Sequence, residues 1–170
     1  GIIGCGEIGR AVARRALGFN MRVLYHQRNR LPENVEAELN AEFVSLEKVI
    51  AESDFLSLHV PLSDQTQYMI GAKEIAAMKP TAYLIHTGRG KVVDDSALVK
   101  ALQENKIAGA ALDVFENEPN IDPRFLKLDN VLLQPHQSSG TIETRKVMGQ
   151  LQRDNMSAIF AGEPLLTPVC

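Results

Sequence analysis

The sequence predicts an α/β protein built on a doubly wound parallel sheet of about seven strands. Short apolar segments, bounded by glycine, proline or polar residues, alternate with amphipathic segments of helical period along all 170 residues. This alternation is typical of successive βαβ units. Right-handed crossovers between the parallel strands place helices on both faces of the sheet. The length favours one domain, and no internal repeat or low-complexity tract interrupts it.

The segment Gly1–Gly9 predicts a strand, a tight turn and the start of a helix. Two isoleucines lead into glycines at 4, 6 and 9, and helically spaced apolar residues follow. In this context a G-x-G-x-x-G motif indicates a dinucleotide-binding, Rossmann-type fold. The first glycine makes the turn, the second lets the backbone approach a pyrophosphate, and the third lets the helix pack closely on the strand. The helix N-terminus adds unpaired N–H groups and a partial positive charge. The expected cofactor-binding residues are Gly4, Gly6, Glu7, Ile8 and Gly9. A glycine-rich turn without a ligand is the alternative.

The later elements follow in chain order. The first helix ends at Gly18, which suits a glycine cap. Further strands are expected at residues 21–26, 43–44, 54–60, 81–86, 107–112 and 130–134. Further helices are expected at 45–52 with Ser45 as cap, at 72–78, from Asp94 or Asp95 to 104, and at 141–161 with Gly162 as cap. Residues 31–41 and 116–127 are polar, contain proline and are expected to be loops.

The residues after the second strand indicate which cofactor binds. About 20 residues beyond the glycines, a carboxylate would bind the ribose 2′-hydroxyl of NAD. Gln27 stands at that place instead, followed by Arg28 and Arg30. Guanidinium groups can bind a 2′-phosphate through paired hydrogen bonds. We therefore predict that NADP(H) is preferred, with NAD(H) as the second cofactor; a solvated basic turn is the alternative.

Charge and composition exclude other classes of protein. The net charge of -3 offers no basic surface for nucleic acid, and no apolar run is long enough to span a membrane. Cys5 and Cys170 lack the spacing of a disulfide framework or a metal site, which predicts no metal and favours a reduced, cytoplasmic compartment. The chain starts with Gly1 inside a strand and without a signal peptide, so we expect a fragment or an excised domain.

The candidate functional residues follow the ends of different strands. Ligands of such a sheet bind outside the carboxyl ends of its strands. The residues that fall there are Gln27 and Arg28 after the second strand, Val60 and Pro61 after the fourth, Thr87, Gly88 and Arg89 after the fifth, Asp113 after the sixth and His136 after the seventh. A random scatter of polar residues would not fall so consistently at one edge. Thr66, shortly after the fourth strand, is a further expected cofactor contact.

Five segments resemble the coenzyme-binding domain of the D-isomer-specific 2-hydroxyacid dehydrogenases. They are G-C-G-E-I-G at 4–9, L-H-V-P-L at 58–62, T-G-R-G at 87–90, L-D-V-F-E-N-E-P at 112–119 and Q-P-H at 134–136. The resemblance covers essentially all 170 residues and is greatest to the glyoxylate and hydroxypyruvate reductases. It implies a catalytic triad of Arg89, Glu118 and His136, and a contact of Asp113 with the nicotinamide carboxamide. Glu116 falls at a variable position of the family.

Two departures from the family pattern stand beside the implied triad. His86 takes the place of a common asparagine, and Gln137-Ser138 replaces the usual Ile-Gly. Both are expected to alter the substrate or nicotinamide pocket. His59 is interpreted as an ordinary residue at a strand end.

The residue types suit the reduction of a 2-oxo acid. A histidine titrates near neutrality and can donate a proton to the carbonyl oxygen. A neighbouring carboxylate, Glu118, favours its imidazolium form. Arg89 can bind the substrate carboxylate and polarise the carbonyl group. Taken singly, the histidine would be a structural residue, the arginine a partner of Asp94 or Asp95, and the glutamate a solvated acid.

The sequence therefore predicts an NADP(H)-preferring reductase of small 2-oxo acids such as glyoxylate or hydroxypyruvate. The alternative is a dinucleotide-sensing binding module without turnover, like a corepressor of the same fold. The resemblance implies a homodimer and a second, upstream substrate-binding domain. Since that segment is absent from 1–170, we expect the chain alone to bind dinucleotide but to turn over poorly.

Overall fold

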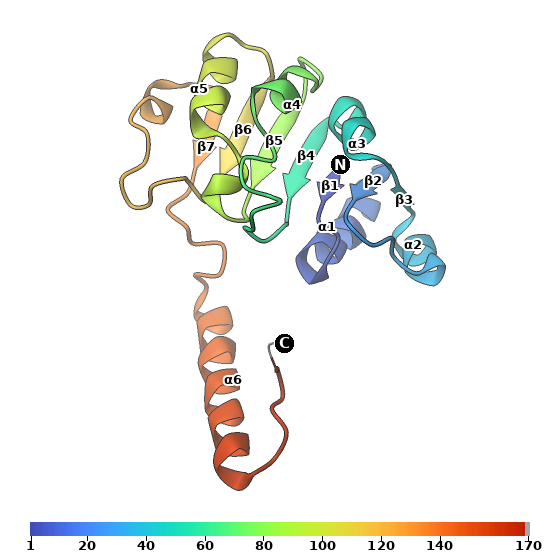
Figure 1. Cartoon of the computed structure of the whole chain (residues 1–170), viewed down its shortest axis with the longest axis vertical. Coiled ribbons are helices and arrows are strands. Elements are labelled where there is room, and N and C mark those ends of the chain that lie inside the picture. The colour runs from blue at the N-terminus through green and yellow to red at the C-terminus, as the bar shows by residue number, and fades with distance from the viewer. Residues whose placement is uncertain (169–170) are drawn as a thin grey trace. The chain divides into compact units, whose positions relative to one another are not determined.

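A computed structural model describes residues 1–168, so Cys170 lies outside the described residues. The chain divides into two compact units, of which the first is Gly1–His136 and the second begins at Gln137. The first unit holds a seven-stranded parallel sheet in the order β3-β2-β1-β4-β5-β6-β7 (Figure 1). Its strands are β1 (Ile2–Ile3), β2 (Val23–His26), β3 (Ala41–Phe43), β4 (Phe55–Leu58), β5 (Tyr83–His86), β6 (Gly109–Leu112) and β7 (Val131–Leu133). This order confirms the predicted doubly wound sheet, with the reversal of strand order between β1 and β4.

The helices of the first unit cover both faces of this sheet. They are α1 (Glu7–Leu17), α2 (Glu33–Leu39), α3 (Leu46–Glu52), α4 (Ala72–Ala76) and α5 (Asp95–Gln103), with 3-10 turns η1 (Gly90–Val92) and η2 (Phe125–Lys127). Successive strand side chains point to opposite faces. Ile2 accordingly packs into a cluster with residues of α1 and α2, and Ile3 into a larger cluster with residues of α3, α4 and α5. The crossovers therefore bury one apolar layer on each face.

Local capping confirms several expected helix ends. The Ser45 hydroxyl accepts a hydrogen bond from Lys48 N at 3.2 Å and begins α3. Asp94, of the two candidate aspartates, caps α5, because its carboxylate accepts a hydrogen bond from Ala97 N at 3.0 Å. Most strand ends fall one or two residues inside the expected bounds, whereas β3 begins two residues before the expected strand at 43–44. Element ends commonly differ from expectation by one or two residues.

The expectation of a loop over residues 31–41 is wrong, because most of it forms α2. Tertiary contacts stabilise this polar helix. Leu39 is fully buried, and the Glu36 carboxylate accepts hydrogen bonds from Tyr25 Oη at 2.5 Å and Arg30 Nη2 at 2.7 Å. Asn40 ends the helix in the left-handed conformation, at φ 45°.

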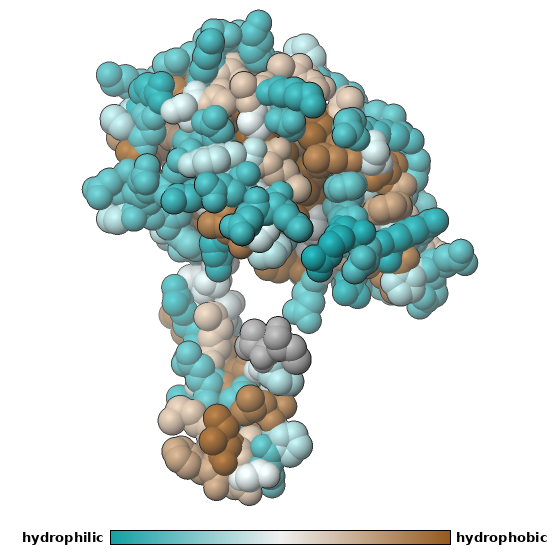
Figure 2. Space-filling view, in the orientation of Figure 1, coloured by the Kyte–Doolittle hydropathy of each residue, from teal (hydrophilic) through white to brown (hydrophobic). Residues whose placement is uncertain are grey.

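The second unit consists of α6 (Ile142–Ala161) and the segment that follows it. Thr141 caps its start by accepting a hydrogen bond from Thr144 N at 3.2 Å, and Gly162 ends it at φ 70°, as the sequence predicts. The side chain of Asn155 donates a hydrogen bond to Thr167 Oγ1 at 3.0 Å, which folds the following segment back along the helix. Figure 2 shows apolar side chains exposed on this unit. The side chain of Phe160, for example, is 84% exposed.

Candidate active site

The glycine turn at the end of β1 has the stereochemistry that the motif predicts. Gly4 has φ +90°, and a Cβ there would lie 2.8 Å from the carbonyl carbon of His59. A Cβ at Gly9 would lie 2.3 Å from the Gly4 carbonyl oxygen, so α1 packs directly on the turn. A Cβ at Gly6 would meet nothing within 4 Å. The backbone is thus open at Gly6, where a pyrophosphate is expected, and tightly packed on both sides of it.

A cleft of about 490 Å³ opens beside this turn, where the strand order reverses. Its walls include many of the residues predicted to bind the cofactor, namely Gly4, Gly6, Gln27, Arg28, Val60, Pro61 and Thr66. Thr66 is held in place because its hydroxyl donates to the Pro61 carbonyl oxygen at 2.6 Å and accepts from Ser63 N at 2.8 Å. The cleft therefore joins segments from β1, β2 and β4 that are far apart in the chain.

Gln27 ties the glycine turn to the loop after β2. Its Oε1 accepts a hydrogen bond from Cys5 N at 2.8 Å, and its Nε2 donates to the Asn29 carbonyl oxygen at 2.7 Å. Arg28 is exposed on the cleft wall and forms no ion pair within residues 1–168. Arg30 instead forms a two-pronged ion pair with Glu36, at 2.7 and 3.0 Å. The structure therefore places one of the two predicted arginines at the cleft and uses the other to fasten α2.

Glu7 and Ile8 point elsewhere. Both side chains line a separate hollow of about 350 Å³ on α1, together with Ala11, Val12 and Arg15. As the first two residues of α1, they can meet a ligand at the glycine turn only through their main-chain N–H groups.

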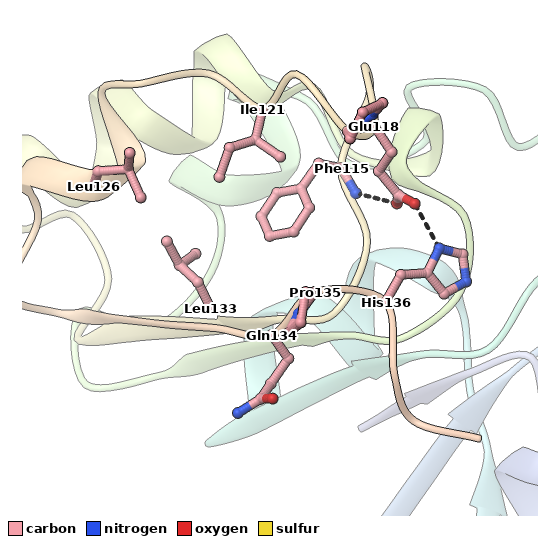
Figure 3. A pocket seen from close by; sticks show the side chains of 9 residues that line it. Phe115, Glu118, Ile121, Leu126, Leu133, Gln134, Pro135 and His136 are labelled. Carbon is pink, nitrogen blue, oxygen red and sulfur yellow. Dashed lines mark hydrogen bonds and ion pairs between the residues drawn. The ribbon is translucent and has the colours of Figure 1, made fainter. Parts of the chain in front are cut away.

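His136 and Glu118 form a hydrogen-bonded pair just beyond the carboxyl ends of β7 and β6 (Figure 3). His136 Nδ1 lies 2.5 Å from Glu118 Oε2, and Phe115 N donates to Glu118 Oε1 at 2.9 Å. Because an ionised carboxylate only accepts, Nδ1 carries the proton and the other ring nitrogen points away from Glu118 (Figure 3). Desolvation raises the pKa of Glu118, but the hydrogen bonds from His136 and Phe115 outweigh it and leave the pKa below its usual range. The carboxylate is thus ionised where it orients the imidazole.

Residues 87–90 form the turn after β5. In the sheet, β5 is the neighbour of β6, the strand that precedes Glu118 in the chain. Thr87 and Arg89 are exposed, and Arg89 Nη1 donates to the Gly88 carbonyl oxygen at 2.8 Å. A Cβ at Gly90 would lie 1.9 Å from the Phe115 carbonyl oxygen, so this turn is packed against the segment that holds Glu118. The Arg89 turn and the His136–Glu118 pair are therefore joined through Phe115.

Asp113 directly follows β6, and its main-chain N–H donates to the His86 carbonyl oxygen at 2.9 Å. Its side chain is buried. It lies at the same edge of the sheet as the Thr87 turn, where the resemblance places the nicotinamide.

An apolar pocket of about 330 Å³ lies beside the His136–Glu118 pair (Figure 3). Its walls are Phe115, Glu118, Pro119, Ile121, Leu126, Leu133, Gln134, Pro135 and His136. The predicted loop 116–127 supplies much of this wall. The pocket thus places an apolar wall beside an imidazole and a carboxylate that both stay partly exposed.

Several residues of the cleft escaped the sequence analysis. Asn29, His59, Ser63, Gln65 and Met69 also line it. The position of His59 directly after β4, at the same edge as the other candidates, is the signal that could have identified it. Its Nε2 lies 2.9 Å from Ser57 Oγ, and burial lowers its pKa.

In residues 1–168, no group of three or more His, Cys, Asp or Glu side chains could hold a metal ion. No helix in that range is long and apolar enough to cross a membrane.

The sheet order, the open glycine turn and the cleft at the point of strand reversal define a dinucleotide-binding α/β domain. Comparison with known families agrees with this class. Residues 1–138 match the D-isomer specific 2-hydroxyacid dehydrogenase, NAD binding domain, and the chain belongs to that family.

Individual relatives place the chain beside glyoxylate reductases. A glyoxylate reductase of Thermococcus litoralis is 53% identical over 163 residues, which are 96% of this chain and 49% of that protein. A crystal structure of a glyoxylate reductase from Paecilomyes thermophila superposes with a TM-score of 0.91 at 45% identity, covering 99% of this chain and 51% of that one. The chain spans about half the length of the curated relatives it matches.

A second solved structure is relevant to the cofactor. An NADPH-dependent glyoxylate/hydroxypyruvate reductase from Sinorhizobium meliloti, in complex with NADP and malonate, has a TM-score of 0.92 and 39% identity. The match covers 99% of this chain and 52% of that one.

Proposed function

We propose that this chain is the coenzyme-binding part of an NADP(H)-preferring reductase of small 2-oxo acids, such as glyoxylate or hydroxypyruvate. The observation that carries the proposal is the 2.5 Å His136–Glu118 pair at the carboxyl edge of the sheet that also carries the dinucleotide cleft. The identity to glyoxylate reductases of several organisms supports the substrate class.

The cleft fits a dinucleotide on stereochemical grounds. Gly6 leaves open the space that a pyrophosphate needs, and the N-terminus of α1 presents main-chain N–H groups beside it. When bound, the reduced nicotinamide supplies the hydride for the carbonyl carbon. Asp113 and Thr87, at the ends of β6 and β5, are the residues proposed to orient the nicotinamide ring.

His136 is the proposed proton donor to the carbonyl oxygen. Glu118 holds Nδ1, so the proton to be transferred is on the other ring nitrogen, and the ionised carboxylate stabilises the imidazolium that carries it. Arg89, on the neighbouring turn, binds the substrate carboxylate and polarises the carbonyl group. In the reverse direction, His136 takes the proton back from the hydroxyl group.

The preference for NADP(H) is proposed to depend on Arg28. This side chain lies on the cleft wall, whereas Arg30 is held by Glu36. A charge-assisted contact contributes about 1.5–3 kcal/mol, so Arg28→Gln should weaken NADPH about tenfold or more and leave NADH within about twofold. Titration calorimetry with both dinucleotides measures this. Equal affinity of the parent chain for NADH and NADPH would reject the preference.

Arg30→Gln is the matched control for that experiment. It removes the same charge from the same loop, but its expected effect is on stability, since it leaves Glu36 without its guanidinium partner. If Arg30→Gln weakens NADPH and Arg28→Gln does not, the assignment of Arg28 is wrong.

The catalytic assignment is tested in the full-length parent protein. A panel of 2-oxo acids, assayed with both cofactors, identifies the substrate, and His136→Ala should lower kcat by about a hundredfold or more. Near-normal turnover would reject His136 as the acid. Dinucleotide binding without reduction of any 2-oxo acid would indicate a sensing module instead.

Three further proposals concern the whole protein. A second domain completes the substrate site, so robust turnover by the 170-residue chain alone would contradict the proposal. A homodimer is proposed from the family resemblance, and light scattering of the full-length protein tests it. The cytoplasmic location also stays a proposal, for which microscopy of a tagged full-length protein is the test.

A further inference from the structure

We propose that His86 is the positioning residue for Arg89: its imidazole N–H holds the Arg89 carbonyl oxygen and so sets the point from which the guanidinium reaches the substrate carboxylate. This inference rests on the proposed function, in which Arg89 binds that carboxylate. His86 is the last residue of β5, where the family resemblance leads one to expect asparagine.

The protonation of His86 follows from its contacts. Its Nε2 lies 3.1 Å from the Arg89 carbonyl oxygen. A carbonyl oxygen only accepts, so Nε2 carries the proton and Nδ1 of the neutral ring carries a lone pair. Burial lowers the pKa of His86 to about 4, although the main chain at Arg89 and Gly90 raises it, so the ring is neutral near pH 7.

The lone pair on Nδ1 has no partner among the described residues, although the side chain is only 1% exposed. A buried acceptor without a partner is unfavourable and calls for a compensating role. The contact of Nε2 with Arg89 supplies one. The same burial prevents His86 from exchanging a proton with a substrate, so it acts through Arg89 and not as an acid.

The backbone on both sides of Arg89 is tightly packed. A Cβ at Gly88 would lie 3.3 Å from the Val60 carbonyl oxygen and 3.4 Å from His86 Cε1. A Cβ at Gly90 would lie 1.9 Å from the Phe115 carbonyl oxygen. His86 therefore holds the carbonyl group of Arg89 on a turn whose two flanking glycines pack against Val60 and Phe115.

This packing also links the turn that carries Arg89 to the other two residues of the proposed triad through Phe115. Gly90 packs against the carbonyl group of Phe115. The N–H of Phe115 donates to Glu118 at 2.9 Å, and Glu118 in turn pairs with His136. The Arg89 side chain itself is exposed and donates to the adjacent Gly88 carbonyl oxygen. Its reach toward a substrate thus depends on the main chain that His86 fastens.

The test compares His86→Leu with His86→Gln in the full-length enzyme. Leucine removes the donor, whereas the glutamine amide can place an N–H near the position of the imidazole Nε2. We expect His86→Leu to raise KM for the 2-oxo acid about tenfold and to leave the Kd of NADPH within about twofold of the parent. For His86→Gln, we expect both KM and Kd to stay within about threefold of the parent. Equal KM increases in the two variants, or a loss of NADPH affinity as large as the change in KM, would overturn the inference.

A double-mutant cycle with Arg89→Ala separates positioning from general loss of stability. If His86 acts through Arg89, then His86→Leu has no further effect on kcat/KM in the Arg89→Ala background. Additive effects would overturn the inference. If His86→Leu fails to fold, His86→Met, which also lacks the donor, takes its place in both measurements.

Failure of the proposed function is distinguishable in the same assays. A parent enzyme that reduces no 2-oxo acid overturns both proposals. An active parent with an unchanged KM in His86→Leu overturns only the role of His86.

Discussion

Gly6 and Gly9 lie in the same turn, but substitution by alanine should affect ligand binding at the first and domain stability at the second. Gly6→Ala should abolish tight dinucleotide binding without unfolding the domain, and Gly9→Ala should destabilise the domain. The difference follows from the surroundings of the added methyl group. At Gly6 it would meet nothing within 4 Å, and at Gly9 it would lie 2.3 Å from the Gly4 carbonyl oxygen.

The cost at Gly9 can be worked from that distance. Ordinary contact begins near 3.4 Å, so the turn or the helix must move by about 1 Å. Overpacking costs about 1–3 kcal/mol, and a main-chain carbonyl cannot rotate away, so the upper end applies. Alanine returns about 1 kcal/mol of helix propensity, which leaves a net loss of about 2 kcal/mol. In a domain of this size this lowers Tm by about 4–8 °C.

The cost at Gly6 falls on binding. Alanine is a poorer N-cap than glycine by about 1 kcal/mol, but it also restricts the unfolded chain by about 0.4–1 kcal/mol, so the net stability should change by less than about 1 kcal/mol. A methyl group that displaces the pyrophosphate from one or two main-chain donors removes about 3 kcal/mol, or more than a hundredfold in Kd.

Titration calorimetry with NADPH and NADH, together with thermal unfolding, measures both effects on the same samples. Gly149→Ala is the matched control. A Cβ at Gly149 also meets nothing within 4 Å, but this glycine lies in α6 and not in the glycine turn. It should leave the affinity unchanged. A Gly6→Ala chain that binds like the parent would show that the pyrophosphate does not lie at this turn, and a Gly9→Ala chain as stable as the parent would refute the packing argument.

Three further changes test the fold. Burial raises the pKa of Asp95 to about 6, so ionising its carboxyl group lowers the stability of the folded state as the pH rises from about 4 through 6. Asp95→Asn, whose amide oxygen can still accept from Glu116 N, should therefore add about 1–3 kcal/mol to the free energy of unfolding at pH 7 and nothing near pH 4, as measured by urea unfolding. Tyr25→Phe leaves Leu31 N–H without its partner and should cost about 1–3 kcal/mol in the same assay, and a change below about 0.5 kcal/mol would contradict this. Ser45→Ala should cost about 1 kcal/mol and Ser45→Asn much less, so equal losses would show that the cap does not stabilise α3.

Much of the fold followed from short segments of sequence. The Gly1–Gly9 segment predicted strand, turn and helix because the stereochemistry of its glycines is local. Caps such as Ser45 and Gly162 were correct for the same reason, since each depends on a side chain or a φ angle within one turn of the helix end. Helix α2 was missed because its stability comes from contacts of Glu36 and Leu39 with other elements.

The sequence alone determined that the candidate residues stand at one edge of a parallel sheet, because strand ends can be located from local patterns. Only the tertiary structure decided which of them meet. It paired Arg30 with Glu36 and left Arg28 at the cleft, and it brought His136 within 2.5 Å of Glu118. The physical reason is that a hydrogen bond depends on distances of a few tenths of an ångström. Such distances are set by how whole elements pack, whereas turns and caps are set within a few residues.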